Sequence, residues 1–71
     1  MKIQYFADTD TLLVSFNDRT VMETRDLDEN TVIEFDAEGR VVAVTLEHAR
    51  QRTDVDSVTY QQINAPAVVP A

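Results

Sequence analysis

The chain has 71 residues, with 13 acidic and 6 basic side chains, a formal net charge of −7, and no cysteine. These numbers fit one small domain and exclude a disulfide framework, and the single histidine also excludes a zinc site built from cysteine and histidine. A chain this short buries only about 60% of its unfolded surface, so we expect it to gain stability from association.

The apolar runs are short, and the longest is the four-residue stretch Val41 to Val44. Signal peptides and membrane spans need longer runs, so we expect a soluble, cytoplasmic protein with no membrane partner. The negative net charge repels phosphate backbones, which makes nucleic acid an unfavourable direct ligand.

The N-terminal residues predict a β-hairpin, with strands over residues 2–6 and 12–16 and a turn containing Asp8 and Asp10 between them. Strand alternation puts one apolar set on the side of the core. This set is Ile3, Tyr5, Leu12, Val14 and Phe16. Phe6 and Leu13 are apolar as well, yet alternation turns them outwards.

Residues 20–27 follow a polar turn and alternate only weakly, which predicts a half-exposed or edge strand. Its charges, Glu23 and Arg25, have a structural explanation, because charged side chains on an edge strand discourage uncontrolled pairing with other chains.

The strongest local pattern is a second hairpin, with β-rich runs at Val32 to Phe35 and Arg40 to Leu46. The only glycine, Gly39, supplies the positive φ of a type I turn followed by a left-handed residue. A three-residue loop would pair Phe35 with Val41. A four-residue loop would pair Phe35 with Val42 and keep the apolar sets on one face, and we favour this register.

Residues 47–52 lack strand formers and predict a short helix that packs through Leu46 and Ala49 across one end of the sheet. Together, residues 1–52 predict an α+β fold: a small antiparallel β-meander of four to five strands with a short C-terminal helix.

The C-terminal third is less regular. Residues 53–64 fit an additional strand through Val58 and Tyr60 or a helical face through Val55, Val58 and Ile63, and periodicity does not decide between them. Residues 65–71 contain two prolines and predict a flexible tail.

Residues that carry chemistry are few. Glu34 and Asp36 lie two apart in a predicted strand, and His48 is the only histidine. The chain has no nucleophile elbow and no glycine-rich phosphate loop, so we expect no enzyme activity, no cofactor and no metal site. The alternative is a small-molecule or metal-binding domain, or a weak enzyme, that uses Glu34, Asp36 and His48.

Several motifs in order resemble a family of small bacterial and archaeal proteins called domain of unknown function 2283. The resemblance covers about 50 residues and rests on MKIQY at the start, Asp10-Thr-Leu-Leu-Val, Glu23-Thr-Arg-Asp-Leu, Phe35-Asp-Ala-Glu-Gly-Arg-Val-Val-Ala-Val, and Ala49. It implies a small β-meander with a short C-terminal helix. It supplies no catalytic residues, and it implies that some members act as small acidic partners of compact toxin-like proteins.

The small size and the apolar positions on the outer side of the sheet predict a protein–protein interaction module. We expect a homodimer or higher homo-oligomer, with the small basic protein as a second partner suggested by the net charge. The expected interface residues are Phe6, Leu13, Val32 and Val41.

Overall fold

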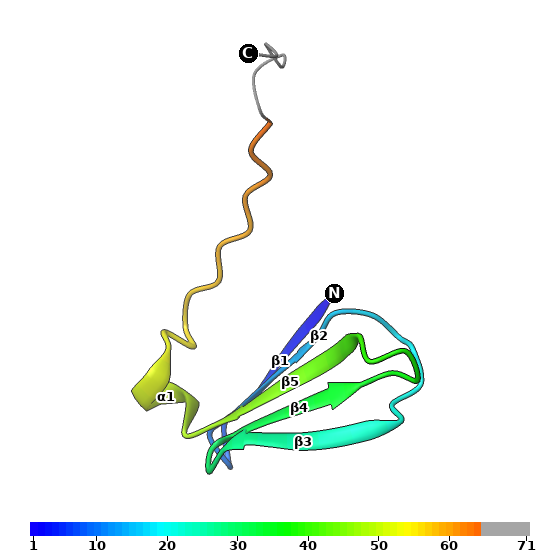
Figure 1. Ribbon diagram of the computed structural model, residues 1–71. Coiled ribbons are helices and arrows are strands. Elements are labelled where there is room, and N and C mark those ends of the chain that lie inside the picture. Colours follow the sequence, from blue (N-terminus) through cyan, green and yellow to red (C-terminus); the bar gives the residue numbers. More distant parts are fainter. Residues whose placement is uncertain (65–71) are drawn as a thin grey trace, which may run out of the picture.

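A computed structural model describes residues 1–64 as a five-stranded antiparallel sheet followed by one short helix (Figure 1). The strands are β1 (Lys2–Phe6), β2 (Thr11–Ser15), β3 (Glu23–Asp28), β4 (Thr31–Phe35) and β5 (Val41–Glu47), and the helix is α1 (Ala49–Arg52). The predicted fold class, a small antiparallel β-meander with a short C-terminal helix, is confirmed.

The last strand lies in the middle of the sheet, because the strand order is β1-β2-β5-β4-β3. Residues 16–22 connect β2 to β3 along one end of the sheet, and both ends of this connection are bonded to the strands they pass (Figure 1). The amide of Phe16 donates to the carbonyl of Val42, and that of Met22 to the carbonyl of Phe35, each at 2.8 Å. β5 therefore joins two hairpins into one sheet.

The first hairpin has the predicted faces, although β2 runs from Thr11 to Ser15 and not over residues 12–16. Ile3 pairs with Val14 and Tyr5 with Leu12, so these four side chains share one face of the sheet. Leu13 pairs with Gln4 and therefore points to the other face, as expected.

The turn between β4 and β5 is the predicted type I turn followed by a left-handed glycine. The amide of Gly39 donates to the carbonyl of Asp36 at 3.1 Å, and the amide of Asp36 donates to the carbonyl of Arg40 at 2.9 Å. Gly39 has a φ of 79°, and a side chain added there would meet no atom within 4 Å. The need for glycine at this position is therefore conformational and not steric crowding by neighbours.

This turn fixes a register that differs from the favoured one. Phe35 pairs with Val41, so the pairing with Val42 is wrong. Next to this pair β5 carries one extra residue, which forms a β-bulge. The side chain of Val42 is buried there, with 5% of its surface exposed, whereas Val41 is 39% exposed. A β-bulge, and not the predicted four-residue loop, therefore keeps the apolar sets of β4 and β5 on one face.

β3 is an edge strand, as predicted, and all of its residues are exposed. It begins at Glu23 and not at Thr20, because Thr20 to Met22 belong to the connection that brings the chain to the edge.

The helix is shorter than predicted. Glu47 belongs to β5 through its pairing with Thr11, and His48 adopts a left-handed conformation with a φ of 55° that ends the strand. Helix α1 therefore starts at Ala49, which is completely buried. The predicted packing of Ala49 at one end of the sheet is confirmed.

After α1, residues 53–64 form neither of the two structures that periodicity allowed. They contain no strand and no helix, and they lead away from the sheet (Figure 1). The predicted flexible tail, residues 65–71, lies outside the described residues.

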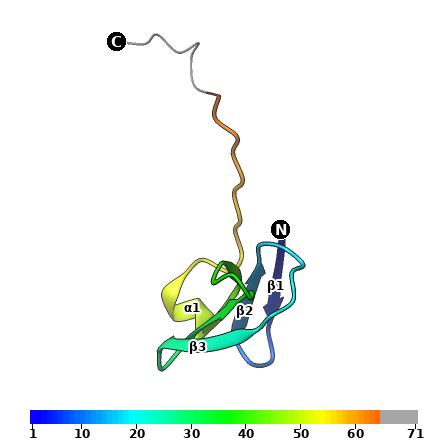
Figure 2. The same cartoon turned by 45° about the vertical axis from the view of Figure 1, so that its right-hand side comes forward.

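Burial is low for a folded chain. Among residues 1–64, the buried apolar residues are Val42, Ala43 and Ala49, and no large side chain is fully buried. Figure 2, in which the sheet is turned, shows a single layer of strands with α1 to one side. Within the same residues, no helix has the length and apolar character needed to cross a membrane.

The buried position of Val42 gives a stability prediction. Val42→Asp places a carboxylate at a site without a partner, which should destabilise the fold by at least about 3 kcal/mol. That is a large part of the roughly 4–10 kcal/mol typical for this chain length. Val41→Asp is the matched control, because its side chain is half-exposed. Urea unfolding followed by circular dichroism should show a much larger loss for Val42→Asp, and equal losses would contradict the bulge geometry.

Candidate interaction surface

One face of the sheet, here called the apolar face, carries most of the large apolar side chains of the strands. Its members are Ile3, Tyr5, Leu12, Val14, Phe16, Ile33, Phe35, Val42, Val44 and Leu46. Directly paired residues form a continuous apolar row across four strands, in the order Ile3, Val14, Val44, Ile33. Such cross-strand pairs stabilise the sheet and leave the same side chains available on its surface.

The β1–β2 side of the apolar face has a partial cover from the chain that follows α1. Residues 53–59 face Ile3, Tyr5, Leu12 and Val14 across a groove of about 610 Å³. Val55 is half-buried there, whereas Val58 is 65% exposed. The cover is therefore loose and ends near β1.

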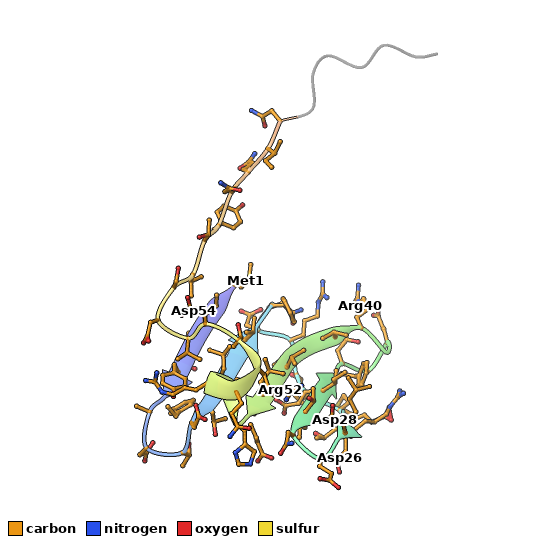
Figure 3. All side chains as sticks on the ribbon, turned by 90° about the vertical axis from the view of Figure 1, so that its left-hand side faces the viewer. Met1, Asp26, Asp28, Arg40, Arg52 and Asp54 are labelled. Carbon is orange, nitrogen blue, oxygen red and sulfur yellow. The ribbon has the colours of Figure 1, made fainter. Side chains whose placement is uncertain are left out.

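Arg52 attaches α1 to the β3–β4 side of the sheet, at the same end of the apolar face. Its guanidinium donates to the carbonyl of Asn30 at 2.7 Å and to the hydroxyl of Thr31 at 2.6 Å, and it lies 3.9 Å from the carboxylate of Asp28 (Figure 3). These contacts explain why Thr31, a polar residue, is only 3% exposed. The helix covers one end of the apolar face and leaves the rest open.

A second attachment of α1 centres on Asp10, which has a φ of 53°. Its carboxylate accepts hydrogen bonds from the hydroxyl of Tyr5 at 2.7 Å and from the amide of Arg50 at 3.1 Å. Its carbonyl accepts the amide of Ala49 at 3.0 Å. The hydrogen bond between Tyr5 and Asp10 raises the pKa of the Tyr5 hydroxyl and lowers the pKa of the Asp10 carboxyl.

Sequence reasoning missed this cluster, because Asp10 was interpreted as a turn former alone. Aspartate also tolerates the left-handed backbone conformation and accepts hydrogen bonds from backbone amides. These two properties are the sequence signal from which the cluster could be predicted. The cluster fixes α1 to the turn between β1 and β2 and has no partner typical of a catalytic site.

The β5–β4 side of the apolar face has no cover in the described chain. Phe16 is 46% exposed, and Ile33, Phe35 and Val44 are half-buried. Arg25 lies at its edge, with its guanidinium carbon 4.4 Å from the centre of the Phe35 ring. Arg25 also pairs with Glu23 at 2.7 Å, so the strand positions of this face carry two charges that neutralise each other.

The expected interface residues lie mostly on the other face. Phe6, Leu13 and Val32 share this opposite face, as their pairing positions require, and Phe6 is 43% exposed. Val41 lies at the bulge, where alternation does not assign a face. Polar and charged strand residues surround this group, namely Lys2, Gln4, Thr11, Ser15, Thr24, Asp26, Glu34, Thr45 and Glu47.

The three residues proposed for a ligand site or weak enzyme do not come together. His48 follows the end of β5 that pairs with Thr31, whereas Asp36 follows the opposite end of β4. Asp36 follows Thr31 by five positions along the extended chain, which is about 16 Å at the usual rise. Glu34 lies on the opposite face, and within residues 1–64 no three histidine or acidic residues are close enough to hold a metal ion.

Asp36 has a structural role instead. It is 7% exposed, and its carboxylate accepts the amides of Arg40 and Glu38, each at 2.9 Å. The guanidinium of Arg40 lies 3.2 Å away and that of Arg19 lies 3.7 Å away. The amide of Arg40, then that of Glu38, and the charge of Arg40 lower the pKa of the Asp36 carboxyl. Asp36 therefore closes the turn between β4 and β5 and does not face a site.

Comparison with protein families agrees with the resemblance seen in the sequence. The family described as "Protein of unknown function (DUF2283)" matches residues 2–50, which is more than half of the chain and includes all five strands. The chain belongs to this family. Neither the curated proteins nor the solved structures include a match.

The buried carboxylate of Asp36 predicts a dependence of stability on pH. A folded-state pKa below the ordinary value of 3.8 stabilises the fold above about pH 4, and this contribution is lost as the pH falls through the folded-state pKa. Asp36→Asn keeps an oxygen acceptor for the turn amides but does not titrate. Its urea midpoint should therefore fall less between pH 5 and pH 3 than that of the parent.

The residual slope of Asp36→Asn should come from Asp10, Asp28 and Glu23, whose pKa values are also lowered by hydrogen bonds. Glu38→Gln is the control, because it removes a 70% exposed carboxylate from the same turn. Parallel profiles for the parent and Asp36→Asn would contradict the role of Asp36.

Proposed function

We propose that this member of the DUF2283 family is a protein–protein interaction module that self-associates through the apolar face of its sheet. The observation that carries the proposal is the single layer of strands: a face with aliphatic and aromatic side chains on every strand except β3 has, within residues 1–64, only α1 and residues 53–59 against it. Folded domains ordinarily bury such a face against a second layer.

The energetics favour a partner. Burying one aliphatic or aromatic side chain contributes about 1.5–3 kcal/mol, and Ile3 and Phe16 are each more than 40% exposed. A few such contacts are comparable with the whole stability of a domain of this length. A partner that binds the folded chain alone stabilises it by mass action.

The distribution of charge favours a second copy as this partner. Two chains of net charge −7 repel each other overall, but the apolar face presents only the neutralised pair Glu23 and Arg25. Eight acidic and two basic residues belong to the segments 7–10, 26–30 and 47–56, which meet at the end of the sheet near α1. The strand positions of the apolar face can therefore bind a second copy without burying this acidic end of the sheet.

The opposite face is the weaker choice for the interface. Phe6, Leu13 and Val32 are separated there by polar side chains, and the latter two are already half-buried. We retain this face as the comparison against which the proposal is tested.

Binding of a small basic protein and a cytoplasmic location stay predictions of the sequence. The acidic end near α1 supports the first, because it would attract a basic surface without involving the apolar face. A ligand or enzyme role for Glu34, Asp36 and His48 is not proposed, because these residues lie apart.

Neighbouring residues of β4 provide the test, since Ile33 lies on the apolar face and Val32 on the opposite face, and both are half-buried. The parent should sediment as a homodimer at micromolar concentration. Ile33→Glu should weaken the dimer by at least tenfold, because a carboxylate would enter the apolar interface. Val32→Glu should leave the dissociation constant nearly unchanged.

Circular dichroism identifies any variant that loses the sheet, and Val44→Gln, a milder change in the same apolar row, replaces Ile33→Glu in that case. A parent that sediments as an 8.0 kDa monomer at all concentrations would contradict the proposal. Loss of the dimer in Val32→Glu alone would assign the interface to the opposite face.

A further inference from the structure

The last described residues, 57–64, are here called the C-terminal arm. They begin within the loose cover and leave the sheet as an extended chain (Figures 1 and 2). The arm passes Met1 and Ile3, where Val58, Thr59 and Tyr60 lie nearby, and then continues beyond the end of β1. Within the described chain, residues 58–64 make no hydrogen bond to the sheet.

The arm carries the most exposed large apolar side chains of the described residues. Val58, Tyr60 and Ile63 are 65%, 78% and 83% exposed. Figure 3 shows the side chains of the arm standing clear of the sheet. Such an exposed segment has little burial to offset the entropy cost of ordering it, and binding to a surface would supply that burial.

The arm is also free of charge. All 19 charged residues of the chain lie between Lys2 and Asp56, and none occurs from Ser57 to Ala71. Solvated tails are usually rich in charge, whereas this arm combines apolar side chains with the amides of Gln61, Gln62 and Asn64. It can therefore approach a chain of net charge −7 without electrostatic repulsion.

The arm of a chain leaves the sheet beside Ile3 of β1, whereas the β5–β4 side of the same apolar face lies farther along the sheet. Residues 53–59 occupy the β1–β2 side, and the arm then moves away from the sheet (Figures 1 and 2). On the β5–β4 side, Phe16 is 46% exposed and Ile33, Phe35 and Val44 are half-buried, with the guanidinium of Arg25 over the Phe35 ring. A single copy thus has an exposed apolar segment and, within residues 1–64, a partly exposed apolar surface.

The area of the sheet supports an interface that includes the arm. Five strands about 4.8 Å apart and about 17 Å long give a face of roughly 400 Å². A standard interface buries about 800 Å² of each partner. Contact between two sheet faces alone is therefore small, and an extended eight-residue arm supplies a contact of similar size.

We propose that the homodimer exchanges its C-terminal arms: Tyr60 and Ile63 of each copy bind the β5–β4 side of the apolar face of the other copy. In this arrangement each face is covered by its own residues 53–59 on the β1–β2 side and by the arm of the partner on the other side. The inference rests on the proposed self-association and assigns the segment that completes the interface.

The first test uses the absence of cysteine from the chain. A spin label is attached at Gln62→Cys, between Tyr60 and Ile63, and the labelled protein is mixed with ¹⁵N-labelled parent that carries no spin label. Broadening of the amide signals of Phe16, Ile33, Phe35 and Val44 in the ¹⁵N copy is expected, because only contact between copies produces it. A label at Glu38→Cys, in the exposed turn between β4 and β5, is the control for non-specific encounters.

The second test measures how much the apolar side chains of the arm contribute to dimer affinity. Tyr60→Ser combined with Ile63→Ser should raise the dimer dissociation constant at least tenfold in sedimentation equilibrium, while Gln61→Ser combined with Gln62→Ser should leave it unchanged. Both double variants should keep the circular dichroism spectrum of the parent, because the arm lies outside the sheet.

The outcomes distinguish the two proposals. A parent that is monomeric at all concentrations would overturn both self-association and the arm exchange. A parent dimer that is unaffected by Tyr60→Ser with Ile63→Ser, and whose ¹⁵N copy shows no broadening from the spin label of the other copy, would overturn the arm exchange alone. A second sample, in which the ¹⁵N-labelled chain itself carries the spin label and is diluted with unlabelled parent, reports contact within one chain. Broadening in this sample but not in the mixed sample would also overturn the arm exchange, because the arm would then bind its own sheet.

Discussion

The pairing of β5 with both β2 and β4 is the constraint on which the rest of the structure depends. Without β5 the chain would consist of two separate hairpins, and an isolated two-stranded hairpin is marginal in water. Two of the three buried apolar residues, Val42 and Ala43, belong to β5, and the strand leads directly into α1. The turn held by Asp36 and the bulge at Val41 and Val42 set the register of this strand.

A single sheet has two faces, and residues 1–64 cover neither of them completely. The helix has one turn and is fixed by Asp10 at one side and by Arg52 at the other, so it closes only the end of the apolar face. The remaining surface is apolar because the same side chains that pair across the strands also point out of the layer. The structure thus combines complete backbone pairing in the middle of the sheet with incomplete side-chain burial.

Charge and apolar surface occupy different parts of the chain. The acidic excess gathers near α1, the apolar face has one neutralised ion pair, and everything after Asp56 is uncharged. In the proposed self-association, this separation would keep the repelling charges outside the contact surfaces. The acidic composition is therefore compatible with the proposal.

Local sequence patterns predict the features that depend on neighbouring residues: the alternation that separates Ile3 and Tyr5 from Phe6, and the turn that requires Gly39. The sequence also identified β3 as an edge strand from its charges, and the family from the order of the motifs. These features follow from period-two alternation and local backbone preferences. The same alternation also predicts that Phe6, Leu13 and Val32 share the opposite face.

Only the tertiary structure decided what depends on contacts between distant residues. The central place of β5, the pairing of Phe35 with Val41, and the docking of α1 by Asp10 and Arg52 all join segments that are far apart or offset by one residue. Alternation gives the same two faces for every strand order, so it could not reveal that the predicted core side has no second layer. Which face is left uncovered is decided by where the chain goes after β5.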